Sequence, residues 1–130
     1  MKSEEQVEEF ERLEQQLHSM LTEVSELSKK KANDGVNKFK LKFINVILVE
    51  LNEIIGTDKP FEDFEKFDEN DLPTNSDVVV MLSQYAAAVN RFRTQNTQFS
   101  THDRLWRWLI NKKLSDIKTD NPTHYKYVGR

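Results

Sequence analysis

FERLEQQLHSMLTEVSEL, residues 10–27, is the stretch that decides the fold class. Its apolar side chains recur at alternating intervals of three and four residues: Phe10, Leu13, Leu17, Met20, Val24 and Leu27. This a/d spacing is typical of a helix that packs against another helix. Acidic residues precede the stripe and lysines 29–31 follow it, which complements the helix dipole at both ends. The sequence therefore predicts a helix over about residues 4–31.

A second helix is predicted over residues 36–55, after a turn at Asn33-Asp34-Gly35. One face of this helix is expected to carry Phe39, Phe43, Ile47, Leu51 and Ile54. Further apolar residues extend this surface around much of the helix: Leu41, Ile44, Leu48 and Ile55. Such a helix is expected to be central in a bundle and to touch several neighbours. The short turn predicts that it packs antiparallel to the helix over 4–31.

A second heptad stripe predicts a third helix. Its members are Val78, Leu82, Tyr85, Val89, Phe92 and Phe99. Thr74, followed three residues later by Asp77, is a variant of the capping box that starts a helix. We expect this helix to fray near residues 94–98, where polar Asn96 interrupts the stripe.

Two more helices complete the predicted fold. A fourth main helix is expected over about residues 100–117, with apolar positions at Leu105, Trp106, Trp108, Leu109, Ile110, Leu114 and Ile117. Pro60 predicts a short helix in the 56–73 connection, with Phe61, Phe64 and Phe67 docked on the bundle. The predicted fold class is all-α, a single bundle of four main helices plus this short one. Residues 1–118 are expected to form the bundle, and residues 119–130 a tail that is partly disordered or extended.

The sequence offers no signature of catalysis or of a cofactor. It has 130 residues, no cysteine, and three histidines (His18, His102 and His124) without metal-ligand spacing. Motifs for nucleophilic catalysis and phosphate binding are missing. The acidic segment 62–71 lacks the glycine and the final glutamate of a calcium loop. We therefore expect no enzyme activity, cofactor, metal or small-molecule substrate. Without a long apolar stretch we also expect no membrane partner and a cytoplasmic location.

The leading functional hypothesis is a small interaction or regulatory protein that binds another protein or a second copy of itself. The candidate interface is the stripe of the first helix: Phe10, Leu13, Leu17 and Val24. A second copy would complete this narrow stripe in a homodimer, and otherwise the same residues are bundle core. The acidic segment 62–71 and the tail are further candidate surfaces.

The alternative hypothesis is an accessory subunit that binds nucleic acid through two basic segments, 29–42 and 91–107. The candidate contacts are Lys38, Lys40, Lys42, Arg91, Arg93, Arg104 and Arg107. Basic side chains near Trp106 and Trp108 would suit contact with phosphates and stacking on bases. The net charge of −3 argues against this hypothesis, and tryptophans at helical spacing usually belong to a core.

Overall fold

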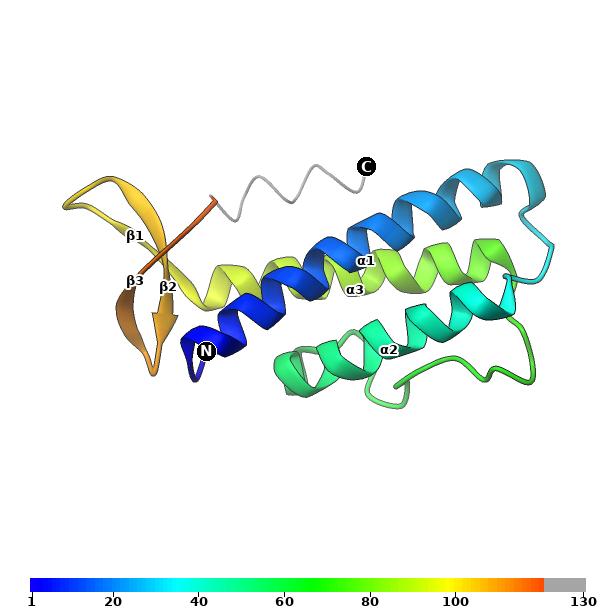
Figure 1. Ribbon diagram of the computed structural model, residues 1–130, viewed down its shortest axis with the longest axis horizontal. Helices are drawn as coiled ribbons and strands as arrows, with labels where there is room; N and C mark the ends of the chain where they lie inside the picture. The colour runs from blue at the N-terminus through cyan, green and yellow to red at the C-terminus, as the bar shows by residue number, and fades with distance from the viewer. Residues whose placement is uncertain (121–130) are drawn as a thin grey trace.

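The structure, a computed structural model, describes residues 1–120 as an α+β fold with three helices and an antiparallel sheet of three strands (Figure 1). The elements follow in the order α1 (Glu4–Lys31), α2 (Lys38–Ile55), the 3-10 turn η1 (Gly56–Asp58), α3 (Asn75–Gln95), β1 (Thr97–Ser100), β2 (Leu105–Ile110) and β3 (Lys113–Thr119). The all-α prediction is therefore wrong. Residues 121–130, which hold most of the predicted tail, lie outside the described residues.

Side-chain caps explain where the three helices begin. Ser3 accepts a hydrogen bond from the backbone N–H of Gln6, and Asn37 accepts one from Lys40, each 3.1 Å long. Thr74 accepts from the N–H of Asp77 at 3.1 Å, as the sequence predicted. These oxygens satisfy donors that the first helical turn leaves without partners. The predicted bounds of the first helix are confirmed, and those of the second lie within two residues of α2.

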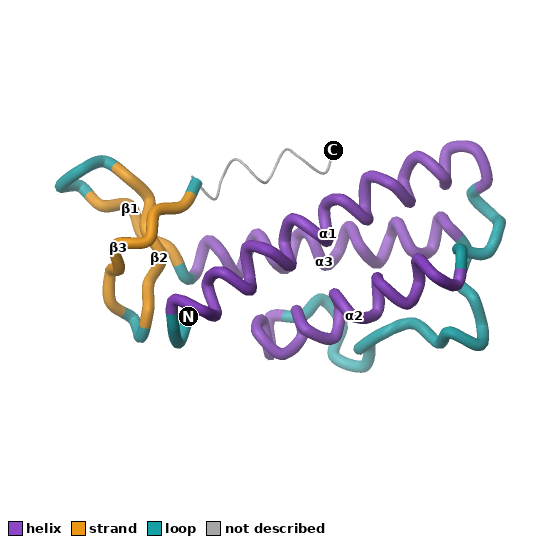
Figure 2. The backbone as a smooth tube through the Cα atoms, viewed as in Figure 1, coloured by secondary structure: helices purple, strands orange, loops and turns teal. Residues whose placement is uncertain are grey.

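The helices lie side by side, and the sheet lies across one end of them (Figure 1). α2 and α3 run in the same direction, antiparallel to α1. This is possible because residues 59–73, here called the strap, return along the length of α2 (Figure 2). At the end far from the sheet, Asn75 N–H donates to Asp34 O, and Val36 N–H donates to Pro73 O, both at 2.9 Å. These bonds tie the α1–α2 turn to the start of α3.

One apolar core joins the helices to the sheet. α1 contributes Phe10, whose ring lies 5.2 Å from that of Phe92 on α3 and 5.4 Å from that of Trp108 on β2. Trp108 is fully buried. Burial of aromatic rings is the largest single apolar contribution a side chain can make, so these rings hold the sheet against the helix ends.

The predicted helix over 100–117 is wrong, because these residues form most of the sheet. β2 pairs antiparallel with β1 and with β3. Asn111 and Lys112, which join β2 to β3, have φ values of 52° and 66°. Positive φ at both central residues is the signature of the tight type I′ hairpin turn, and asparagine tolerates it well. Phe99, taken as the end of the second heptad stripe, belongs to β1.

The short helix predicted to start at Pro60 does not form, because the helical part of the 56–73 connection is η1, which ends at Asp58. Side chains of α2 bind the backbone of the strap and hold it beside the helix as a series of turns and bends. Asn45 donates to Phe67 O and accepts from Phe67 N–H, each at 2.9 Å, and Asn52 donates to Glu65 O at 2.9 Å. These bonds replace the bonds that a helix would make within itself. Phe64 and Phe67 pack against the core as expected, whereas Phe61 is exposed.

Candidate functional site

α2 carries apolar side chains on two opposite faces. The inner face supplies the core with Leu41, Ile44, Leu48, Leu51 and Ile55. The outer face exposes Phe39 at 69%, Phe43 at 53% and Val46 at 55%, together with Val49. The rings of Phe39 and Phe43 contact each other edge to face, with centroids 5.0 Å apart. Single exposed apolar residues are ordinary, but a contiguous row on one helix is typical of an interaction surface.

These side chains form the floor of a groove of about 560 Å³, here called the α2 groove. Its floor residues are Phe39, Lys42, Phe43, Val46, Val49 and Glu50. Lys66 and Glu69 of the strap form one rim, because Asn45 fixes the strap beside α2 through its two bonds to Phe67. An apolar floor with a charged rim is the usual composition of a protein-binding surface.

Charge is divided along α2. Its first turns carry Lys38, Lys40 and Lys42, and its second half carries Glu50 and Glu53. Lys40 lies 3.6 Å from Glu23 of α1, which draws its charge away from the groove. Lys42 and Glu50 remain on the groove floor, one helical turn before and one after Val46.

The sequence missed this surface. The sequence predicted a central helix covered on several sides, whereas α2 buries the face with Leu41 and Leu48 and leaves Phe39 and Phe43 exposed. Val46 and Val49 were not singled out. The one available signal was that α2 is apolar on more of its circumference than a helix with one buried face requires.

The predicted interface stripe of α1 lies inside the molecule. Phe10, Leu13, Leu17 and Val24 are all fully buried in the common core. Of the two roles that the sequence left open, dimer interface or bundle core, they have the role of bundle core. α3 and α2 complete the stripe within one chain. A second copy would have to open this core to reach them.

The candidate nucleic-acid contacts are divided between the two ends of the molecule. Lys38, Lys40 and Lys42 lie at the α2 end that is far from the sheet, whereas Arg104 lies in the β1–β2 turn and Arg107 in β2 (Figure 1). The two basic segments therefore do not form one surface.

The arginines differ in their surroundings. Arg91 is exposed, and its guanidinium donates to Asp58 O at 3.4 Å. Arg107 forms ion pairs with Asp103 and Asp116. The hydrogen bond from Arg107 holds the pKa of Asp103 well below its usual 3.8, at about 2, and the same contact raises the pKa of Arg107. Arg107 is thus already paired with carboxylates of the β1–β2 turn and of β3.

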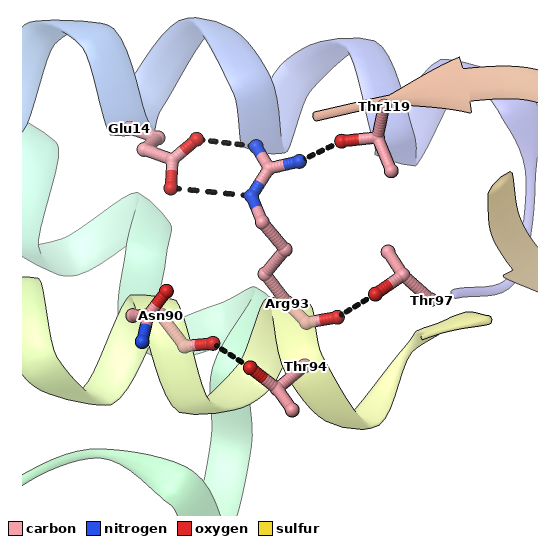
Figure 3. A network of polar contacts seen from close by, with 6 residues as sticks. All are labelled: Glu14, Asn90, Arg93, Thr94, Thr97 and Thr119. Carbon is pink, nitrogen blue, oxygen red and sulfur yellow. Dashed lines mark hydrogen bonds and ion pairs between the residues drawn. The ribbon is translucent and has the colours of Figure 1, made fainter. Parts of the chain in front are cut away.

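Arg93 lies in the interior, where it joins α3 to α1 and to the sheet (Figure 3). Its guanidinium donates to both carboxylate oxygens of Glu14 and to the hydroxyl of Thr119. It also lies 4.8 Å from the ring centroid of Trp108 and 5.7 Å from that of Phe10. A guanidinium with ion-pair, hydroxyl and ring contacts is a structural group, and it does not face a ligand at the surface.

Glu11 lies at the edge of this buried cluster. Burial raises its pKa, and the positive charge of Arg93 opposes that shift. The indole N–H of Trp108 lies nearby and also lowers the pKa of Glu11. Burial therefore makes the ionised form of Glu11 less favourable than it is in water. The carboxyl lies close to the Glu14–Arg93 pair, in which each charge already has its partner.

Within residues 1–120 no three histidine, aspartate or glutamate side chains come together as a metal site would require. His18 and His102 lie on separate elements, and His124 lies outside the described residues.

None of the three described helices combines the length and the hydropathy needed to cross a bilayer. Comparisons with protein-family models, curated proteins and solved structures gave no match. Among the described residues, the α2 groove is the surface on which a function can be proposed.

Proposed function

We propose that this chain is a protein-binding module that acts through the α2 groove. The observation that carries the proposal is the exposed row of Phe39, Phe43 and Val46 on a helix whose opposite face is fully packed. Burial of such rings supplies most of the free energy in protein interfaces, and charged rim residues select the partner. The surface is part of a helix, so it binds without the entropic cost of ordering a loop.

Nucleic-acid binding has less support. Its candidate residues are divided between the two ends of the molecule, and Arg93 is buried. Binding to a phosphate backbone would weaken steeply between low and moderate salt. A gel shift with Lys38→Glu and Arg104→Glu variants tests it, since both side chains are exposed.

The test of protein binding compares two matched valines. Val46 lies on the groove floor and is 55% exposed, whereas Val80 lies on α3 outside the groove and is 61% exposed. The purified full chain, Val46→Asp and Val80→Asp are each immobilised and incubated with lysate of the source organism. Bound proteins are then quantified by mass spectrometry.

We expect the wild type and Val80→Asp to recover the same proteins. The recovered amount should be about tenfold or more lower with Val46→Asp, since a charge in an apolar interface must be desolvated. Circular dichroism of both variants controls for folding. Equal recovery by all three proteins would show that the groove binds no protein.

A further inference from the structure

The floor of the α2 groove has an internal symmetry about Val46. Phe43 and Val49 lie three residues before and after it, and Lys42 and Glu50 lie four residues before and after it. On an α-helix, positions three and four residues apart share one face. Val46 is therefore surrounded by an apolar pair and by a pair of opposite charges.

The part of this surface between Lys42 and Glu50 is complementary to itself. When two identical helices cross antiparallel on a two-fold axis at Val46, each residue before the axis faces the residue equally far after it on the second helix. Lys42 then lies level with Glu50 of the second copy, and Phe43 lies level with its Val49. The Lys42–Glu50 ion pair therefore forms twice, and no like charges of α2 meet.

The parallel arrangement lacks this match. It would place Lys42 against Lys42 and Glu50 against Glu50, and like charges directly opposite each other oppose association. The charge division along α2 thus specifies one direction of packing.

We propose that the α2 groove binds the same face of a second copy of this chain, with the two α2 helices antiparallel about an axis near Val46. This inference rests on the proposed protein-binding function and names its partner. The homodimer expected from the sequence would then form through the exposed face of α2 and not through the buried stripe of α1.

The exposed area is compatible with a dimer. With about 200 Å² of surface on a free phenylalanine side chain, Phe39 and Phe43 together expose roughly 240 Å². A stable interface buries about 800 Å² on each partner. The two rings would supply about a third of that area, and the valines, the charged side chains and the strap rim lie around them.

A charge-exchange experiment tests the pairing. Lys42→Glu and Glu50→Lys each place like charges at both contacts of a homodimer. Mixing the two variants restores opposite charges at both contacts of a heterodimer. We expect the wild type to be dimeric by sedimentation equilibrium, and each single variant to show about a tenfold or larger rise in dissociation constant.

The equimolar mixture should recover the wild-type dimer. A wild type that remains monomeric at millimolar concentration overturns the proposal. A dimer that neither variant weakens places the contact elsewhere and also overturns it. Circular dichroism confirms that each variant is folded.

The absence of cysteine from the sequence permits a second measurement. Val46→Cys introduces a single thiol next to the proposed axis, where mild oxidation should join two copies rapidly. Val80→Cys is the matched control and should cross-link at least about tenfold more slowly. Equal rates would overturn the proposal.

These results separate the dimer from the proposed function. A monomeric wild type whose captured proteins are still lost with Val46→Asp refutes self-association alone. A monomeric wild type with no groove-dependent capture refutes both.

Discussion

Replacement of Arg93 with methionine should destabilise the protein more than any exposed substitution on α3. Arg93 is 1% exposed and Glu14 is 4% exposed, so the variant leaves a carboxylate buried without its counter-charge. Breaking a buried ion pair by removing one partner costs about 3–5 kcal/mol. The bond to Thr119 and the contacts with the two rings are lost as well, and they place the expected loss toward the upper part of that range.

The magnitude can be assigned to the pair by a double-mutant cycle. Glu14→Leu alone should be similarly costly, because it leaves a buried guanidinium. The double variant Glu14→Leu/Arg93→Met removes both charges and should lie within about 2 kcal/mol of the wild type. The coupling free energy of the pair is the change in unfolding free energy of the double variant minus the sum of the changes in the two single variants.

Urea unfolding at pH 7, followed by tryptophan fluorescence and circular dichroism, measures each free energy of unfolding. Arg91→Met is the matched control, because Arg91 is an exposed arginine on the same helix, and it should cost less than about 0.5 kcal/mol. A loss below about 1 kcal/mol in Arg93→Met would refute the reasoning. Strict additivity of the two single variants would refute it equally.

Three further predictions follow from single residues. The carboxyl of Asp103 should titrate near pH 2 by NMR, and Arg107→Gln should move its pKa toward the usual 3.8, since the hydrogen bond from Arg107 is the main cause of the shift. Its contribution to stability should be complete above about pH 4 and should vanish as the pH falls to 2; an unshifted titration in the wild type would contradict this. Burial raises the pKa of Glu11, so Glu11→Gln should increase the melting temperature at pH 7, and the gain should disappear below about pH 4.5, where the carboxyl is protonated in both states. A lower melting temperature at pH 7 would show that the attraction of Arg93 outweighs burial. Gly56 has a φ of 55°, so Gly56→Ala should cost about 1–3 kcal/mol in thermal unfolding. In Gly35→Ala the new methyl group meets Leu72 at an ordinary 3.6 Å and should cost much less; equal losses would rule out strain at Gly56 as the cause.

The helices were predictable because their signals are local. α1 and α3 combine regular apolar spacing with a capping residue or a charged end, and Thr74 occupies the N-cap that the sequence indicated. Long periodic segments carry enough repeats to exceed chance, so both their type and their approximate bounds can be predicted.

The sheet was not predicted because its residues fit both periods. Trp106, Trp108 and Ile110 alternate as a strand does, yet together with Leu109 and Leu114 they also fit the three- and four-residue spacing of a helix. The type I′ turn at Asn111-Lys112, which requires positive φ at both residues, decides in favour of the hairpin. The turn lacks the glycine by which such hairpins are usually found in a sequence.

The candidate site was hidden by the same limits. α2 is apolar on two faces, and periodicity cannot say which of them the core covers, so Phe39 and Phe43 were placed inside. Arg93 was taken as a surface cation because its partner Glu14 lies 79 residues earlier, and spacing along the chain cannot detect such a pair.

The two asparagine amides that hold the strap have a consequence for how the surface can evolve. Asn45 and Asn52 contact backbone atoms of the strap and not its side chains, apart from one contact from Asn45 to Glu69. Many charged side chains of the strap can therefore be substituted during evolution without a change in the path of its backbone. Selectivity for a new partner can then arise by substitution at one border of the surface, without any penalty in the hydrophobic interior.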